Sequence, residues 1–451
     1  MRISTAVLFL VVSLVAVPTR ELRANGGAWQ IGVSSTGNAA PSDKKRVTEV
    51  TIEEEQLTID LHYNFAAVEV SYRMRNTGAK VVQDFFFPVE RWRPSDGDGE
   101  GEKPADLEDY RITADNVELK WKDVPSPEKG VTVTDEHWDD FPPARKLWKK
   151  SEIPFAPGQT REVVIRYRAG YSGSQGGVSD DYQQSDQVLV YSLSPAATWK
   201  GTIGKGKAAV NIVHPQPDEV TIKQPKRRFQ KVNETRFEWE FRGLEPTLAD
   251  DVKIVARRGY KTYPVRNAAP ENEEEAGASI GDYLIQGERY FLVHSDFEAV
   301  ASSTLPPAGE TNYEVKNLAN TSSDATWAEG VAGDGIGESI TLESRRPLPL
   351  EAILIMPGYQ SSEDPSLWEK NNRVAELEVT LNDEKRFTAK IPDEKFSEAY
   401  PLLVRDYAKP VRTVKLVIKA VHPGTAARDT CISSLRLKAK LAQKPEFNPA
   451  R

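Results

Sequence analysis

Cysteine and histidine are scarce in this chain. Cys431 is the only cysteine among 451 residues, which excludes an internal disulfide. The pattern Cys431-Ile432…Leu435…Leu437 predicts a buried strand thiol rather than a nucleophile. The five histidines stand singly, without the His-x-x-x-His or paired Cys/His spacing of a zinc site. The one Gly-x-Ser-x-Gly string, GASIG (277–281), follows an acidic run rather than an apolar strand, so the sequence offers no recognised catalytic motif.

Long hydrophobic runs are absent after the N-terminus. One apolar run extends from Ile3 to Val17, follows the basic Arg2 and ends at Pro18. At about 15 residues it is short for a membrane span, and its layout predicts a signal peptide over residues 1–24. Cleavage before Asn25 gives a secreted or periplasmic protein without a transmembrane segment, and an uncleaved anchor is the alternative. Export without disulfides is typical of a bacterial envelope protein.

Basic residues are outnumbered by acidic ones. The chain has 59 Lys and Arg against 67 Asp and Glu, a formal net charge of −8. Loss of residues 1–24, which contain three arginines and one glutamate, takes this charge to −10. An acidic, well-mixed surface argues against nucleic acid and anionic lipid as partners.

No long helical stripe interrupts the chain, and short runs of two-residue alternation take its place. They occur over residues 50–61, 68–74, 163–167, 237–241 and 252–254. Such runs, separated by turn residues such as Pro157-Gly158 and Gly243, predict an all-β fold. We expect a β-sandwich region over residues 25–262, built as one large or two small sandwiches.

The remaining boundaries follow from composition. The acidic stretch NAAPENEEEAGASIG (267–281) has no apolar period and predicts a linker over residues 263–282. A second all-β domain is then expected over residues 283–441, followed by a disordered tail at 442–451.

The C-terminal third carries one ordered signature. Its segments are ASSTLPPAGETNYEVKNL (301–318), TWAEGVAGDGIGESITL (326–342), IMPGYQSSED (355–364), EKNNRVAELEV (369–379) and VHPGTAARDTCISSLRL (421–437). This series resembles the NADase-type glycan-binding domain, a bacterial branch of the discoidin or coagulation-factor C-type jelly rolls. The resemblance implies a galactose-binding-like jelly roll that binds sugar. The NAD-cleaving activity of the toxin that names the family is not implied, because an appended module does not transfer its neighbour's chemistry.

Residues 25–262 resemble, through shorter elements, an uncharacterised family of secreted bacterial β-domains. The elements are Val70-Ser71-Tyr72, Arg75-Asn76-Thr77, Phe86-Phe87-Pro88 and Trp199. That resemblance implies a shared fold and no assigned activity.

Sugar recognition needs an aromatic face together with planar polar groups held by loops on a rigid scaffold. The segments of the signature supply Trp327, Glu329, Asp334, Tyr359, Asn371, Asn372, Arg373 and Asp429 as candidate ligand-binding residues. Tyr359 and Arg373 are expected to be exposed. Two alternatives stay open: Trp327 as a core residue, and Arg373 paired with Asp429 or Glu329 inside the loops.

Two loops of the signature raise the question of a bound ion. Related jelly rolls carry an Asp-Gly turn after Asn-Leu that often holds calcium, and here Asn317-Leu318 lacks that turn. Asn320 and Asp324 remain as the side-chain oxygens for a structural calcium, and no other cofactor is expected. The glycine series over residues 333–337 lacks the Lys-Ser/Thr of a phosphate loop and predicts a tight turn instead.

The sequence therefore favours an exported, non-enzymatic bacterial envelope protein whose C-terminal module binds a glycan or cell-surface polysaccharide. One alternative is a structural or assembly protein whose jelly-roll loops bind a protein partner. Another is a hydrolase with an unrecognised site in residues 25–262, formed by carboxylates that folding brings together.

Overall fold

The computed structural model describes residues 36–37, 48–89, 107–125, 147–171, 175–178, 181–184, 186–266, 279–309, 311–319, 325–396 and 398–446. Almost all regular structure in these ranges is β-strand, which confirms the all-β prediction. The short helices are η1 (Ser194–Thr198), η2 (Pro217–Glu219), η3 (Leu248–Asp250), η4 (Val315–Ala319) and α1 (Leu367–Lys370). No helix within the described residues is long and apolar enough to cross a bilayer.

The chain divides into two compact units, which we call unit 1 and unit 2. Unit 1 ends at Ile254 and unit 2 begins at Val255. Two earlier segments, Tyr171–Val188 and His214–Thr221, also belong to unit 2. The boundary therefore differs from the expected one at residue 262, because these segments pair and pack with C-terminal strands.

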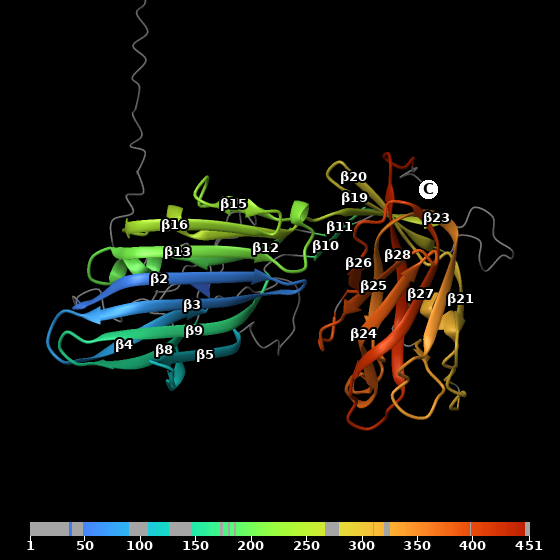
Figure 1. The fold of residues 1–451 in the computed structure, drawn as a ribbon, viewed down its shortest axis with the longest axis horizontal. Helices are drawn as coiled ribbons and strands as arrows, with labels where there is room; N and C mark the ends of the chain where they lie inside the picture. Colours follow the sequence, from blue (N-terminus) through green and yellow to red (C-terminus); the bar gives the residue numbers. More distant parts are fainter. Residues whose placement is uncertain are drawn as a thin grey trace, which may run out of the picture. The chain divides into compact units, whose positions relative to one another are not determined.

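Unit 1 is built on an eight-stranded sheet (Figure 1). In spatial order its strands are β15 (Gln230–Asn233), β16 (Arg236–Leu244), β13 (Ile203–Ile212), β2 (Val50–Leu61), β3 (Phe65–Asn76), β9 (Thr160–Gly170), β5 (Glu108–Ala114) and β6 (Val117–Glu118). A three-stranded sheet has the order β4 (Val81–Val89), β8 (Leu147–Phe155) and β7 (Trp121–Pro125). A four-stranded sheet has the order β1 (Thr36–Gly37), β12 (Gln187–Ser192), β17 (Val252–Arg257) and β14 (Thr221–Gln224).

The core of unit 1 lies between the eight-stranded sheet and the smaller sheets. Strand alternation places one face of β3 inward, and Tyr72 on that face is buried. Its ring packs edge-on against Phe85 of β4 at 6.2 Å between centroids, and its hydroxyl lies 3.4 Å from that of Tyr191 in β12. Phe87 of β4 packs in the same way on Tyr167 of β9, at 5.4 Å. These contacts join the sheets of unit 1 around one core.

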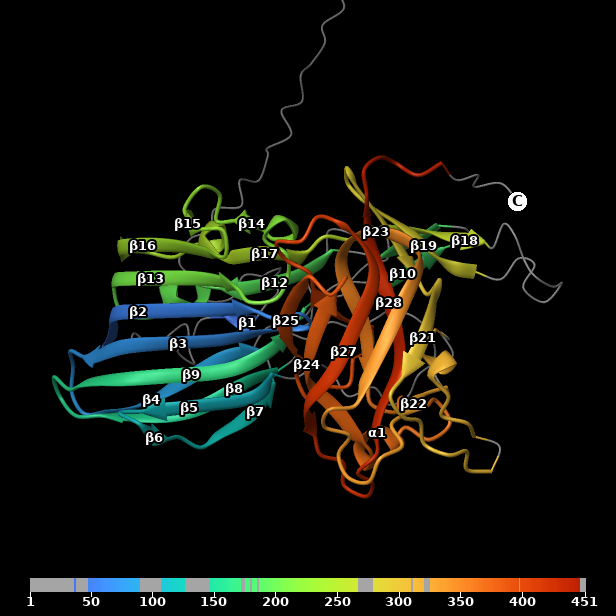
Figure 2. The same ribbon diagram turned by 45° about the vertical axis from the view of Figure 1, so that its right-hand side comes forward.

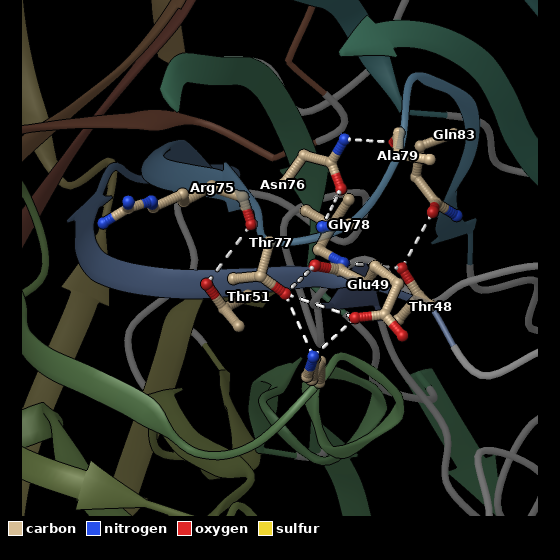
Figure 3. A network of polar contacts seen from close by, with 11 residues as sticks. Thr48, Glu49, Thr51, Arg75, Asn76, Thr77, Gly78, Ala79 and Gln83 are labelled. Atoms are coloured by element: carbon tan, nitrogen blue, oxygen red, sulfur yellow. Dashed lines mark hydrogen bonds and ion pairs between the residues drawn. The ribbon is translucent and has the colours of Figure 1, made fainter. Parts of the chain in front are cut away.

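A polar network fixes the turn after β3 (Figure 3). Asn76 is fully buried, and its Nδ2 donates to the carbonyl oxygens of Ala79 (2.7 Å) and Ala156 (3.1 Å). Next to it, the Thr77 hydroxyl donates to the Glu49 carbonyl at 2.8 Å, and Lys200 Nζ lies 3.0 Å from that hydroxyl. Asn76-Thr77 was one of the elements of the N-terminal resemblance, and its role here is to hold the turn.

Unit 2 contains a sheet of 13 strands that folds over on itself. Along its main path the order is β10 (Gln175–Val178), β11 (Asp181–Gln184), β18 (Lys261–Arg266), β19 (Ser279–Gln286), β20 (Arg289–His294), β28 (Thr430–Leu441), β23 (Ser339–Pro357), β27 (Pro410–His422), β24 (Asn372–Leu381) and β25 (Lys385–Lys390). Three more strands branch from this path: β21 (Phe297–Ala301) and β26 (Tyr400–Leu403) on β23, and β22 (Trp327–Ala328) on β28.

One long strand, β23, joins the two layers of unit 2. Its first part pairs with β27, where Leu342 lies opposite Val414. Its second part pairs with β28, where Ile353 lies opposite Leu437. The register shifts between Glu343 and Leu348, where the strand crosses from one layer to the other. This crossing closes the sandwich expected of a jelly roll.

The stretch predicted as a linker between domains lies inside unit 2, which begins at Val255. β18 and β19 pair antiparallel, with Tyr263 opposite Tyr283, so residues 263–266 and 279–282 lie in strands. Residues 267–278 lie outside the described ranges. The apolar alternation of Tyr263 and Val265 was the signal for the first strand, and the neighbouring acidic composition obscured it.

A buried histidine in β20 makes the stability of unit 2 sensitive to acid. His294 is 1% exposed; its Nδ1 accepts a hydrogen bond from the Asp296 amide (3.2 Å), and no described residue pairs with its Nε2. Burial is the main cause that lowers the pKa of His294 from 6.5 to about 4.

The neutral His294 therefore contributes its full stabilisation above pH 6.5. The free energy of unfolding of unit 2 is expected to fall as the pH drops toward 4. The unfolded chain binds a proton there that the folded unit does not, and the loss amounts to about 3 kcal/mol. Urea denaturation at pH 7 and pH 4.5 measures it, and His294→Asn, which retains an acceptor but does not titrate, should lose less between the two values. An equal loss in both proteins would contradict the assignment.

Candidate functional site

Five loop segments of unit 2 meet at one end of the jelly roll, which we call the loop end. They are residues 302–309, 311–319, 325–338, 358–371 and 423–430. Hydrogen bonds join them directly: the Leu305 amide donates to the Ala328 carbonyl, and the Thr425 amide to the Glu369 carbonyl, both at 2.9 Å. Figure 2 shows α1 and β22 at this end, opposite β18 and β19. All eight candidate ligand-binding residues lie on these segments or at the strand ends beside them.

Arg373, expected to be exposed, is buried at the start of β24 with 6% of its surface accessible. Its guanidinium forms a two-point ion pair with Asp393, with Nε 2.8 Å from Oδ1 and Nη2 3.1 Å from Oδ2. Nη1 donates to the carbonyl oxygens of Trp368 and Asn371, each at 3.0 Å. The guanidinium also stacks on the Trp368 ring at 4.3 Å. The expectation of exposure is wrong, and so is the alternative pairing with Asp429 or Glu329.

Gly358 makes room for this arrangement. A Cβ at that position would lie 2.8 Å from Arg373 Cγ and 2.9 Å from Trp368 Cδ1. The backbone of Gly358 also has φ of 82°, which side-chain-bearing residues rarely adopt. Both constraints require glycine between β23 and the loop that follows it.

Tyr359 is also buried rather than exposed, with 9% of its surface accessible. It packs with Ala328 and Cys431, and its ring meets the ring of Tyr313 edge-on at 6.4 Å. The sequence contained the signal for this, because Tyr359 continues the buried odd-numbered series of Ile353 and Ile355.

Asn372 and Asp334 bind each other and the surrounding loops. Asn372 is 1% exposed, and its Nδ2 donates to the Arg428 carbonyl (2.8 Å) and to Asp334 Oδ1 (3.1 Å). The Asn372 Oδ1 accepts from the Gly424 amide at 2.7 Å. The Arg428 guanidinium holds the Asp334 carboxylate at 2.6 and 2.7 Å and lowers the pKa of Asp334 to about 2.

Asn371, Trp327 and Glu329 also have local structural partners. Asn371 is half-buried, and its Nδ2 donates to the Leu367 carbonyl at 2.8 Å. Trp327 is fully buried and its Nε1 donates to the Ser303 carbonyl, which confirms the core alternative. Glu329 is fully buried and accepts hydrogen bonds from the amides of Val331 (2.8 Å) and Thr430 (3.2 Å).

The glycine series that includes Gly335 shapes the loop beside Glu329, as the sequence predicted. Gly333, Gly335 and Gly337 all have positive φ, and a Cβ on Gly335 would lie 2.5 Å from Glu329 Cγ.

Asp429 differs from the other seven candidates. Its side chain is half-buried, and no described residue donates a hydrogen bond to its carboxylate or forms an ion pair with it. Burial is the main cause that raises the pKa values of Tyr313, Glu329 and Cys431, and the negative charge of Asp429 adds to it in each case. The carboxylate therefore lies within electrostatic reach of all three groups.

The residues beside Asp429 form an apolar group that the sequence reasoning missed. Ala328, Tyr359 and Cys431 form its buried base, and the partly buried Leu305, Tyr313 and Leu367 pack against them. We call these six residues the loop-end cluster. No described residue hydrogen-bonds to the Tyr313 hydroxyl. An aromatic residue between polar neighbours in a Pro- and Gly-rich loop was the signal for Tyr313.

The predicted calcium ligands, Asn320 and Asp324, both lie outside the described residues, so the structural calcium stays a prediction. Elsewhere in the described part of the chain, no group of three or more His, Cys, Asp or Glu side chains is arranged to hold a metal ion.

Residues 294–438 match the family model of the NAD glycohydrolase translocation F5/8 type C domain. The match lies within the jelly roll, includes every described segment of the loop end, and bears out the resemblance drawn from the sequence. A comparison with curated proteins finds no relative of the chain.

Solved structures with a similar arrangement share little sequence with the chain. A candidate nutrient-binding protein of Legionella pneumophila is 12% identical, with a TM-score of 0.35 over 50% of this chain and 71% of its own. A candidate chitobiase fragment of Bacteroides thetaiotaomicron is 10% identical, with a TM-score of 0.27 over 34% of this chain and 92% of its own. CpGH89CBM32-4 of Clostridium perfringens, solved with GlcNAc-α-1,4-galactose, is 12% identical, with a TM-score of 0.21 over 32% of this chain and 90% of its own. These scores are too low to define the fold, which rests on the strand pairing.

Arg373 of the jelly roll should prove structural when it is removed. Arg373→Ala leaves Asp393 and the two carbonyl oxygens without their donor, so the free energy of unfolding of unit 2 should fall by about 2–4 kcal/mol. The matched control is Arg412→Ala, which breaks an exposed ion pair with Glu343 (2.8 Å) and should change it by less than about 1 kcal/mol. Urea denaturation of the three proteins checks the difference. If both variants lose an equally small amount of the free energy of unfolding, Arg373 has no structural role.

Proposed function

We propose that the F5/8 type C domain binds carbohydrate at the loop end, with Asp429 and Tyr313 as its main contacts. The observation that carries this proposal is the partly accessible Asp429 carboxylate beside the loop-end cluster. A carboxylate accepts hydrogen bonds from two neighbouring hydroxyls of a sugar, and an aromatic ring covers the apolar C–H face of the sugar. The family match supports a carbohydrate-binding module on this scaffold.

The surrounding loops suit this role because they are held rigidly. Asn372 holds the segment before Asp429 through Arg428 and Gly424, and Glu329 holds Thr430 directly after it. β22 fixes the segment at Trp327 through its pairing with Ile432. Contacts that are ordered before binding lose less conformational entropy when the ligand arrives.

The proposal extends to the whole chain as an exported envelope protein with no enzymatic activity of its own. The N-terminal apolar run supports export, and the lack of a recognised catalytic motif in the sequence supports a non-enzymatic role.

The binding site can be tested with paired carboxylate substitutions. Asp429→Asn keeps the size of the side chain and removes its charge, and should weaken binding of a neutral oligosaccharide by about 10- to 100-fold. Tyr313→Ala should have a similar effect, and Tyr313→Phe a smaller one, because the ring remains.

The matched control is Asp383→Asn, which makes the same change in an exposed turn at the far end of β24, roughly 30 Å away along the ten-residue strand. Calorimetric titration with thermal melting of each variant gives the comparison. If Asp429→Asn binds as the unmodified protein does, the site lies elsewhere; if all variants bind a protein from the envelope and no sugar, the protein-partner alternative holds.

Export has its own test. N-terminal sequencing of the protein from its native host should begin at or near Asn25, because the apolar run and Ala24 fit a cleavable signal. Recovery of the chain with Met1 intact in a membrane fraction would favour the uncleaved anchor.

A further inference from the structure

The loop end is strongly acidic. Its described segments carry eight acidic and three basic side chains, a formal net charge of −5. The acidic residues are Glu314, Glu329, Asp334, Glu338, Glu363, Asp364, Glu369 and Asp429, and the basic residues are Lys316, Lys370 and Arg428. This excess exceeds half of the net charge of −8 on the entire chain.

All three basic residues already have acidic partners. Lys316 Nζ lies 2.5 Å from Glu314, Lys370 Nζ 3.3 Å from Asp364, and Arg428 Nη2 2.6 Å from Asp334. Two further cations lie close to the loop end: Arg373 is buried against Asp393, and the exposed Lys395 donates to the Pro365 carbonyl at 3.4 Å. Within the described segments, no basic side chain is therefore left to receive an anionic group.

Several acidic residues, in contrast, have no partner among the described residues. Asp429 is one, and the exposed side chains of Glu363 and Glu369 are two more. The loops that form the loop end therefore carry an excess of unpaired negative charge.

This charge pattern fits one class of sugar. A hydroxyl or an ammonium group can donate to Asp429, whereas a carboxylate or sulfate would lose its hydration beside like charges without gaining a cation. Repulsion of this kind is an effective source of specificity, because it acts against the wrong ligand without any change in the contacts to the right one.

We infer that the loop end selects sugars that present hydroxyl or ammonium donors and rejects uronic, sialic and sulfated sugars. The inference rests on the proposed function of the same site. It adds the class of ligand and names the unpaired carboxylates, Asp429 at the contact and Glu363 and Glu369 around it, as the groups that set the selection.

The experiment uses the mature chain and two pairs of oligosaccharides, each with one neutral and one anionic member. Lactose is compared with sialyllactose, and galactotriose with trigalacturonic acid, by calorimetric titration at 20 mM and 300 mM salt. The uncharged member of each pair should bind at least about 10-fold more tightly at low salt. The difference should shrink at high salt, because the Debye length falls to less than 10 Å and screens the exposed carboxylates.

Two variants separate the contact from the surrounding charge. Glu369→Gln should reduce the difference in affinity between the neutral and the anionic sugar of each pair. The affinity for the neutral sugar should stay unchanged, because Glu369 makes no contact in the proposed site. Asp429→Asn should reduce the same difference in affinity and should also weaken binding of the neutral sugar.

The outcomes distinguish the inference from the proposal beneath it. Equal or tighter binding of the acidic sugars would overturn the inference and leave carbohydrate binding intact. No binding of any of the four sugars would contradict the proposed function, and the inference with it.

Discussion

The buried guanidinium of Arg373 is the interaction on which the loop end depends. Its ion pair with Asp393 and its bond to the Pro423 carbonyl connect two distant segments to the stretch 368–373, where it also binds the carbonyl oxygens of Trp368 and Asn371. A buried arginine is costly unless its donors are paired, and here the surrounding backbone supplies the partners. The same packing requires the glycine at Gly358, where any side chain would meet Arg373 or Trp368. The loops therefore have one arrangement, set by the polar groups beneath them.

That arrangement separates structural from accessible polar groups. Asn372, Glu329 and Asp334 form hydrogen bonds to neighbouring loops, and these bonds hold the loops in place. Asp429 stands in the same loop as Arg428 but keeps its carboxylate unpaired among the described residues. A binding site built in this way has a rigid frame and a small number of free groups, which suits recognition of a rigid ring such as a sugar.

Much of the fold could be predicted from the sequence. The alternation of Leu57 and Ile59 in β2 and of Val68 and Val70 in β3 predicted strands, and the two strands pair with these residues opposite each other. Alternation is a local property, so the strands follow from it directly. The unit boundary did not follow, because β10 and β11 are separated from β18 by a stretch of chain that belongs to the other unit.

The site was predicted less well, for a physical reason. The sequence shows which residues in a loop are polar. It does not show whether other residues of the same protein already hydrogen-bond or pair with them. Arg373 and Tyr359 looked accessible because they border a loop, yet one is bound to Asp393, 20 residues away, and the other packs on Cys431. Asp429 was selected with the same reasoning as Arg373, and only the three-dimensional contacts distinguish the two.

The central claim is that a sugar occupies the loop end. The most direct test is methyl-selective NMR during titration with an oligosaccharide that binds in calorimetry. Leu305 and Leu367 lie in the loop-end cluster, and their methyl signals report on the space beside Tyr313 and Asp429. The account predicts that the Leu305 and Leu367 methyl signals shift together and saturate with the affinity measured by calorimetry, while Leu381 at the far end of β24 stays unchanged. Saturable shifts at Leu381 or in the strands of unit 1, with Leu305 and Leu367 unaffected, would contradict it.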